Sequence, residues 1–72
     1  MKINEYNAPE VLAKLFKESG KEQQIVARRA GVHRNTVTFW LVRKSSPNLQ
    51  QLCRVLRVLG KQLEVRDIED RN

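Results

Sequence analysis

The chain has 72 residues, of which 40% are hydrophobic and 31% are charged, and this composition predicts one small globular domain rather than a disordered chain. One cysteine and one histidine exclude a disulfide framework and leave too few ligands for a zinc site, so no metal or cofactor is expected. The polar first residues and the lack of a long apolar run predict a cytoplasmic protein without membrane contact.

The net charge of +6 is unevenly distributed along the chain. Residues 23–61, here called the acid-free segment, carry eight lysines and arginines and no acidic residue, whereas residues 1–22 carry four charges of each sign. A folded segment with so many like charges repels itself unless a polyanion binds it, which favours a nucleic acid partner. The alternative is a basic surface that only maintains solubility, but both signs of charge would then be interspersed.

The first predicted helix covers residues 8–19. Asn7 is a suitable N-cap, Glu10 stands three residues later as in a capping box, and Pro9 lies in the first turn. Gly20 is expected to end this helix in the left-handed conformation. The helix is predicted to support the fold.

A second helix is predicted over residues 22–30 and a third over residues 34–42. Gly31 joins them, because glycine adopts a positive φ without Cβ strain, and Val32 is expected to fill the corner. The inward face of the third helix is predicted to comprise Thr36, Val37, Trp40 and Leu41. This arrangement is typical of a helix-turn-helix unit over residues 22–42, with residues 34–42 as its recognition helix.

A fourth helix is predicted to begin after the N-cap Asn48 and to end near Gly60, with an apolar face of Leu49, Leu52, Cys53, Leu56 and Leu59. The alternating pattern of residues 61–68 then predicts a short strand, followed by a frayed tail at 69–72. Since a lone strand needs a partner, the strand is expected to pair with a second copy of the chain. An interface on the fourth helix is the alternative.

The pattern over residues 11–59 resembles the Xre/Cro-type helix-turn-helix family. It comprises Gln23, Ala27, Ala30, Gly31, Val32, Thr36, Val37, Trp40, Pro47, Leu49 and Leu52. The resemblance implies an all-α, lambda-repressor-like domain of four to five helices in residues 1–60, which usually binds DNA as a dimer. Some relatives, antitoxins among them, carry a similar C-terminal strand that pairs across the dimer. Leu41 and Arg43 stand where the family often has Glu and Gly.

DNA base contacts are predicted for the exposed side of the recognition helix, at His33, Arg34, Asn35, Thr38 and Phe39. Arginine binds guanine and asparagine binds adenine through paired hydrogen bonds. His33 has two alternatives, as a helix cap or as a merely exposed residue. Phe39 either packs on a thymine methyl group or belongs to the core. Trp40 is predicted to be a core residue.

DNA backbone contacts are predicted at Gln23, Arg28, Arg43 and Lys44. In the family, the position of Gln23 touches a phosphate at a helix N-terminus, where free backbone N–H groups assist. Arg28 is alternatively only a solvated residue. Dimer contacts are predicted at Leu59, Leu63 and Val65.

The sequence therefore predicts a sequence-specific, nucleoid-associated regulator of transcription that binds double-stranded DNA, as a homodimeric autorepressor on an inverted repeat. An antitoxin that also binds a cognate toxin is the first alternative, and a small phage regulator is the second. One tyrosine and two phenylalanines offer few stacking platforms for RNA. No enzyme is expected, because the acid-free segment holds no carboxylate pair and the chain has no glycine-rich phosphate loop.

Overall fold

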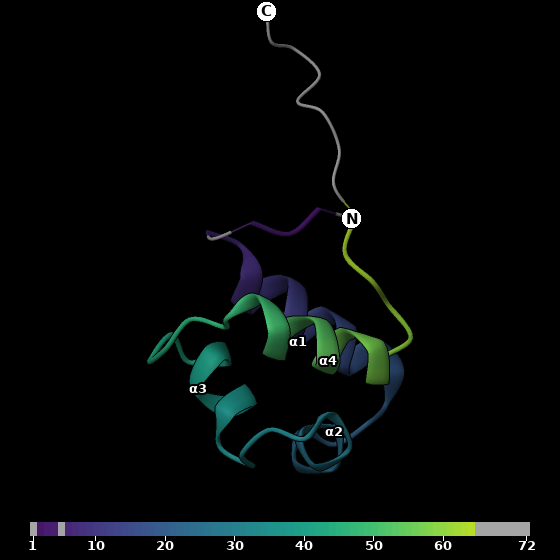
Figure 1. Ribbon diagram of the computed structural model, residues 1–72. Coiled ribbons are helices and arrows are strands. Elements are labelled where there is room, and N and C mark those ends of the chain that lie inside the picture. Colours follow the sequence, from purple (N-terminus) through teal and green to yellow (C-terminus); the bar gives the residue numbers. More distant parts are fainter. Residues whose placement is uncertain (1, 5, 65–72) are drawn as a thin grey trace, which may run out of the picture.

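The structure is a computed structural model, and it describes residues 2–4 and 6–64. The described part of the chain contains four helices (Figure 1). They are α1 (Ala8–Ser19), α2 (Gln23–Ala30), α3 (Thr36–Leu41) and α4 (Leu49–Val58). The prediction of an all-α domain with four helices is confirmed, and α1 has the predicted bounds. No helix in these residues is long and apolar enough to cross a membrane.

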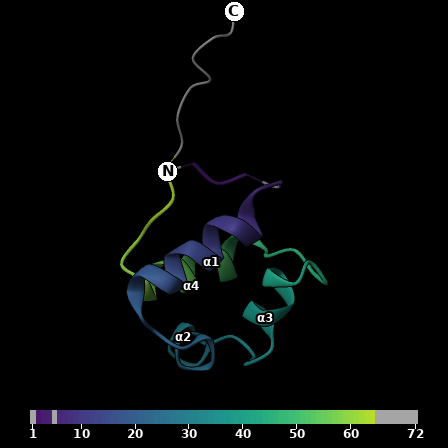
Figure 2. The same ribbon diagram turned by 180° about the vertical axis from the view of Figure 1, so that it is seen from behind.

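The helices α2 and α3 lie together at one end of the molecule. α2 packs against both α3 and α4, and α1 packs against α3. Two opposite views place α2 and α3 on the side away from the N-terminal segment, and residues 61–64 run from the end of α4 toward that segment (Figures 1 and 2). The described terminal segments therefore leave the end that carries α2 and α3 uncovered.

One apolar cluster joins all four helices. Its largest fully buried side chains are Trp40, Leu12, Val26, Val37 and Val55. Ala27 and Ala30 of α2 are also buried, and their small side chains let neighbouring helices approach closely. No polar or charged side chain is buried among the described residues, so packing and apolar burial stabilise this core.

The N-terminus of α1 differs from the predicted capping box. Asn7 occupies the N-cap position, but its φ of −108° and ψ of 4° depart from the extended conformation of a capping residue, and its side chain makes no cap bond. Its Oδ1 atom instead accepts from the Asn4 N–H at 2.7 Å, and its amide donates to the Lys2 carbonyl at 3.1 Å. Glu10 pairs with Arg43. The capping-box prediction is therefore wrong.

The start of α4 confirms one prediction and corrects another. Asn48 caps the helix, since its Oδ1 atom accepts from the Gln51 N–H at 2.8 Å. Leu49 was predicted to belong to the apolar face of this helix, but it is 68% exposed. Val55, which was not included in the predicted face, is fully buried. At about 100° per residue, Leu49 lies roughly 70° from the centre of the stripe that Val55 and Leu56 share. It is also the first residue of the helix, where coverage by neighbours ends.

Half of the predicted C-terminal strand falls outside the described residues. Residues 61–64 form no strand, and residues 65–68, together with the predicted tail, lie beyond the part that the structure describes. Leu63 is partly buried and packs against the core of its own chain. Strand pairing between two copies therefore stays a prediction.

Candidate nucleic-acid interface

The turn between α2 and α3 sets the angle between the two helices. Gly31 adopts a φ of +76°, as predicted, and the Val32 N–H donates to the Ala27 carbonyl at 3.0 Å. This bond and the one from the Gly31 N–H to the Arg28 carbonyl form a Schellman motif, which a glycine at this position favours. Val32 packs against the core and so holds the turn in place.

The inner face of α3 packs into the core, and the outer face is exposed. Val37 is fully buried and Trp40 is 2% exposed, which confirms the core prediction for Trp40. The run that follows divides between core and solvent: Leu41 is partly buried, whereas Val42 is 58% exposed. Phe39 is 41% exposed, which decides between its two alternatives in favour of the surface.

Residues 33–35 precede the helix, because α3 begins at Thr36 rather than at residue 34. His33 is exposed, and its Nδ1 atom accepts from the Asn35 N–H at 3.1 Å, so it caps the turn before α3. With Nδ1 as the acceptor, the Nε2–H group of the neutral ring is the donor left for a ligand. The side chains of Arg34 and Asn35 are exposed and have no hydrogen-bond or ion-pair partner within residues 2–4 and 6–64.

The loop after α3 brings a lysine over the exposed aromatic ring. The Nζ atom of Lys44 lies 5.8 Å from the centroid of the Phe39 ring. The Lys44 N–H also donates to the Phe39 carbonyl at 2.9 Å, so backbone and side chain both tie this loop to α3. A cation over a ring face is a favourable contact, and here it places positive charge beside the exposed apolar surface of α3.

Arg43 stands at a backbone position that favours glycine. Its φ is +64°, and it is the one residue other than glycine with a positive φ among those the structure describes. Its guanidinium pairs with the Glu10 carboxylate of α1, and both side chains are exposed. A backbone hydrogen bond at Glu10 itself and then the hydrogen bond from Arg43 lower the pKa of the Glu10 carboxyl.

We expect Arg43→Gly to be more stable than Arg43→Ala by about 1 kcal/mol, because only glycine adopts this φ without Cβ strain. Both variants lose the contact with Glu10, so the comparison isolates the backbone. Urea unfolding of the two variants measures the difference. At a residue with ordinary φ, the alanine variant would be the more stable one, and that result would contradict the left-handed conformation.

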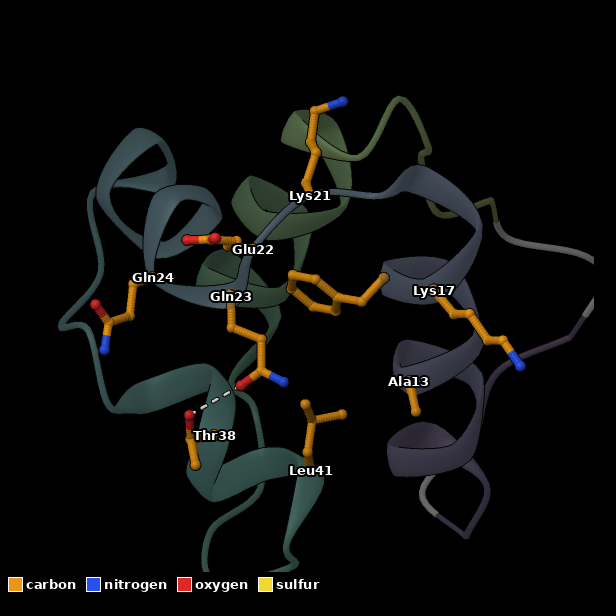
Figure 3. A pocket seen from close by; sticks show the side chains of 9 residues that line it. Ala13, Lys17, Lys21, Glu22, Gln23, Gln24, Thr38 and Leu41 are labelled. Carbon is orange, nitrogen blue, oxygen red and sulfur yellow. Dashed lines mark hydrogen bonds between the residues drawn. The ribbon is translucent and has the colours of Figure 1, made fainter.

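A contact between α2 and α3 joins two of the predicted DNA contacts. The Thr38 hydroxyl donates to the Gln23 Oε1 atom at 2.9 Å. The two side chains border an open hollow of about 540 Å³ between α1, the start of α2 and α3 (Figure 3). Its lining comprises Ala13, Phe16, Lys17, Lys21, Glu22, Gln23, Gln24, Thr38 and Leu41.

Lys17 and Lys21 are candidate contacts that the sequence reasoning missed. Residues 1–22 have no net charge, so this segment was not considered as a site for DNA contacts. Both lysines nevertheless lie within six positions of Gln23 along the chain. Their spacing of four residues on either side of the helix-ending Gly20 was the available signal. The structure places both at the hollow that Gln23 borders, where the lining carries two positive charges against the one negative charge of Glu22 and so favours an anion.

A family model described as helix-turn-helix matches residues 12–65 of this sequence. The chain belongs to the Xre/Cro-like helix-turn-helix family. It is a DNA-binding regulator of transcription, and the family has a regulator fold that is typically non-enzymatic. A comparison with curated proteins finds no significant match.

Four further arginines of this Xre/Cro-like domain are exposed. Arg28 and Arg29 lie in the last turn of α2, and Arg54 and Arg57 lie on α4, which packs against α2. The acid-free segment thus places positive charge on α2 and on the neighbouring α4. Such a field raises the local concentration of a polyanion and speeds its association.

The predicted dimer residues lie in different surroundings. Leu59 is 7% exposed and belongs to the core of its own chain. Leu63 is partly buried against the same core, and Val65 lies outside the described residues. A substitution at Leu59 would therefore disturb the fold of this Xre/Cro-like domain itself, so tests of the dimer belong at other positions.

Proposed function

We propose that this protein is a sequence-specific repressor that reads base edges in the DNA major groove with the residues before and on α3. The observation that carries the proposal is the pair Arg34 and Asn35, which are exposed, have no partner in the described part of the chain, and directly precede a helix whose inner face is fixed in the core. Exposed polar side chains next to an anchored helix are what direct readout requires.

Each reading residue has a chemical role in this proposal. The Arg34 guanidinium matches the O6 and N7 acceptors of guanine, and the Asn35 amide matches the N6 and N7 atoms of adenine. Phe39 is exposed and packs on a thymine methyl group, while the Thr38 methyl group offers a second apolar contact. The Nε2–H group of His33 donates to a base or a phosphate.

The backbone contacts surround these residues. Gln23 at the start of α2, Arg28 at its end, and Arg43 and Lys44 after α3 are the proposed phosphate contacts. Such contacts fix the register of the protein on the duplex and carry most of the salt dependence of binding. Arg43 would reach a phosphate either beside Glu10 or after releasing it.

Selection of bound sequences from a random pool of double-stranded DNA tests the proposal. The expected result is one recurring sequence that the protein binds at least about a thousandfold more tightly than unrelated DNA at physiological salt. A variant with Arg34 and Asn35 both replaced by alanine serves as the control and should enrich nothing. Enrichment of no sequence by the wild-type chain would refute a reading function and leave only charge-driven binding.

We further propose a homodimer that places two recognition helices in successive major grooves of an inverted repeat, about 34 Å apart. The predicted interface is the strand over residues 61–68, in which Leu63 and Val65 share one side. The antitoxin alternative predicts, in addition, an adjacent toxin gene whose product copurifies with this chain.

We expect Val65→Asp to be a monomer in analytical ultracentrifugation and to bind the selected operator much more weakly, because a buried charge would oppose strand pairing. Gln62→Asp is the matched control, since Gln62 lies on the opposite side of the predicted strand, and it should remain a dimer. If Val65→Asp forms dimers at the same protein concentrations as the wild type, the interface lies elsewhere, and α4 is the next candidate.

A further inference from the structure

The hydroxyl of Thr38 is engaged by another residue of the interface. Thr38 lies on α3 and Gln23 is the first residue of α2, and the two are 15 positions apart in the sequence. The hydroxyl donates its proton to Gln23 Oε1 at 2.9 Å (Figure 3). A hydroxyl has one proton to donate, so in this arrangement Thr38 has none left for a base.

The bond determines which end of the Gln23 amide faces outward. With Oε1 occupied by Thr38, the amide nitrogen points away from Thr38, and Gln23 lies at the hollow that Lys17 and Lys21 also border (Figure 3). The nitrogen carries two donors and no acceptor. A donor group at a hollow whose lining also carries two lysines and one glutamate, Glu22, matches a phosphate oxygen, which accepts hydrogen bonds and carries negative charge.

The reverse orientation of the amide would oppose the same ligand. If the amide turned over, its oxygen would face the phosphate, and two acceptors would then meet without a proton between them. A free glutamine also loses much rotamer freedom when it is immobilised on binding. A partner that orients the amide beforehand removes part of that cost and therefore favours the bound state.

We propose that Thr38 is a positioning residue that orients the Gln23 amide toward a DNA phosphate, and that its hydroxyl does not donate to a base. This inference rests on the proposed function. It links the recognition helix to the backbone anchor on α2, so that α3 in its correct position also prepares the phosphate contact. The methyl group of Thr38 remains free for apolar contact with DNA.

Binding of the selected operator by Thr38→Val and Thr38→Ser tests the inference. Valine keeps the shape and the methyl group but removes the hydroxyl, and we expect about threefold to tenfold weaker binding. Serine keeps the hydroxyl but loses the methyl group, so it should bind the operator more tightly than the valine variant and somewhat less tightly than the wild type. Urea unfolding should be the same for all three proteins, because Thr38 is exposed.

The second part of the test is a double-mutant cycle with Gln23→Ala. If Thr38 acts through Gln23, the valine substitution should have no further effect in the Gln23→Ala protein. An operator with a neutral methylphosphonate at the contacted phosphate should bind wild type more weakly, and Thr38→Val should lose less from that change. The preferred base at every operator position should be the same for Thr38→Val and wild type.

Two results would overturn the inference while leaving the proposed function intact. One is wild-type affinity of Thr38→Val for the operator. The other is an additive cycle together with a changed base preference at one position, which would make Thr38 a base-reading residue. If the wild-type chain selects no operator at all, the proposed function fails, and this inference fails with it.

Discussion

Replacement of Trp40 by alanine is expected to lower the free energy of unfolding by about 3–5 kcal/mol. Trp40 is 2% exposed and is the largest of the fully buried side chains. A domain of 72 residues has a total stability of roughly 4–11 kcal/mol, so this loss leaves little or none of it. Urea unfolding followed by circular dichroism measures the change.

The adjacent residue supplies the control for this substitution. Phe39 is another aromatic residue of α3, but it is 41% exposed, so Phe39→Ala should lower the stability far less than Trp40→Ala. The helix has six residues, too few to persist without tertiary packing, so loss of Trp40 should also abolish operator binding. Equal effects of the two substitutions would contradict the inward placement of Trp40.

Replacement of Arg34 by alanine is expected to weaken binding of the selected operator about tenfold to a hundredfold. The loss should be confined to one base position, at which all four bases would then be bound almost equally. The stability should be unchanged, because Arg34 is exposed and has no partner within the described residues. A binding titration against operators that vary at each position measures both the affinity and the specificity.

Lys44→Ala is the matched control, since it also removes one positive charge from the same end of the molecule. It should weaken binding of every DNA sequence by a similar factor and reduce the slope of log affinity against log salt by about 1. If Arg34→Ala instead reproduced this uniform pattern, then Arg34 would contact a phosphate and the reading role would pass to Asn35 and its neighbours.

Local sequence signals predicted the helices well. Gly20, Gly31 and Gly60 end their helices at φ values of +70°, +76° and +78°, and Asn48 caps α4 as its position after Pro47 indicated. Glycine positions and caps are properties of neighbouring residues, so a single sequence displays them. The start of α3 was predicted two residues too early, at residue 34 instead of Thr36. The bond from the Asn35 N–H to the His33 ring holds these residues in a turn before the helix, and the sequence pattern did not indicate that bond.

Contacts between distant segments could not be predicted in the same way. The ion pair of Glu10 with Arg43 joins residues 33 positions apart, and the bond of Thr38 with Gln23 joins residues 15 apart. Each depends on how separate segments are placed in the fold, and the spacing of apolar residues in the sequence does not indicate that placement. For the same reason the contribution of α1 to the hollow, through Lys17, was not foreseen.

The exposed turn of residues 33–35 has a consequence for how this protein can change over time. His33, Arg34 and Asn35 bury nothing in the core and stand before α3 rather than within it. Under the proposed function, substitutions at Arg34 and Asn35 would alter which bases are contacted and leave the free energy of folding almost unchanged, because neither side chain has a partner within the described residues. After a gene duplication, one copy could therefore acquire a new operator by a few changes in this turn, and a designer could reprogram the domain by the same route.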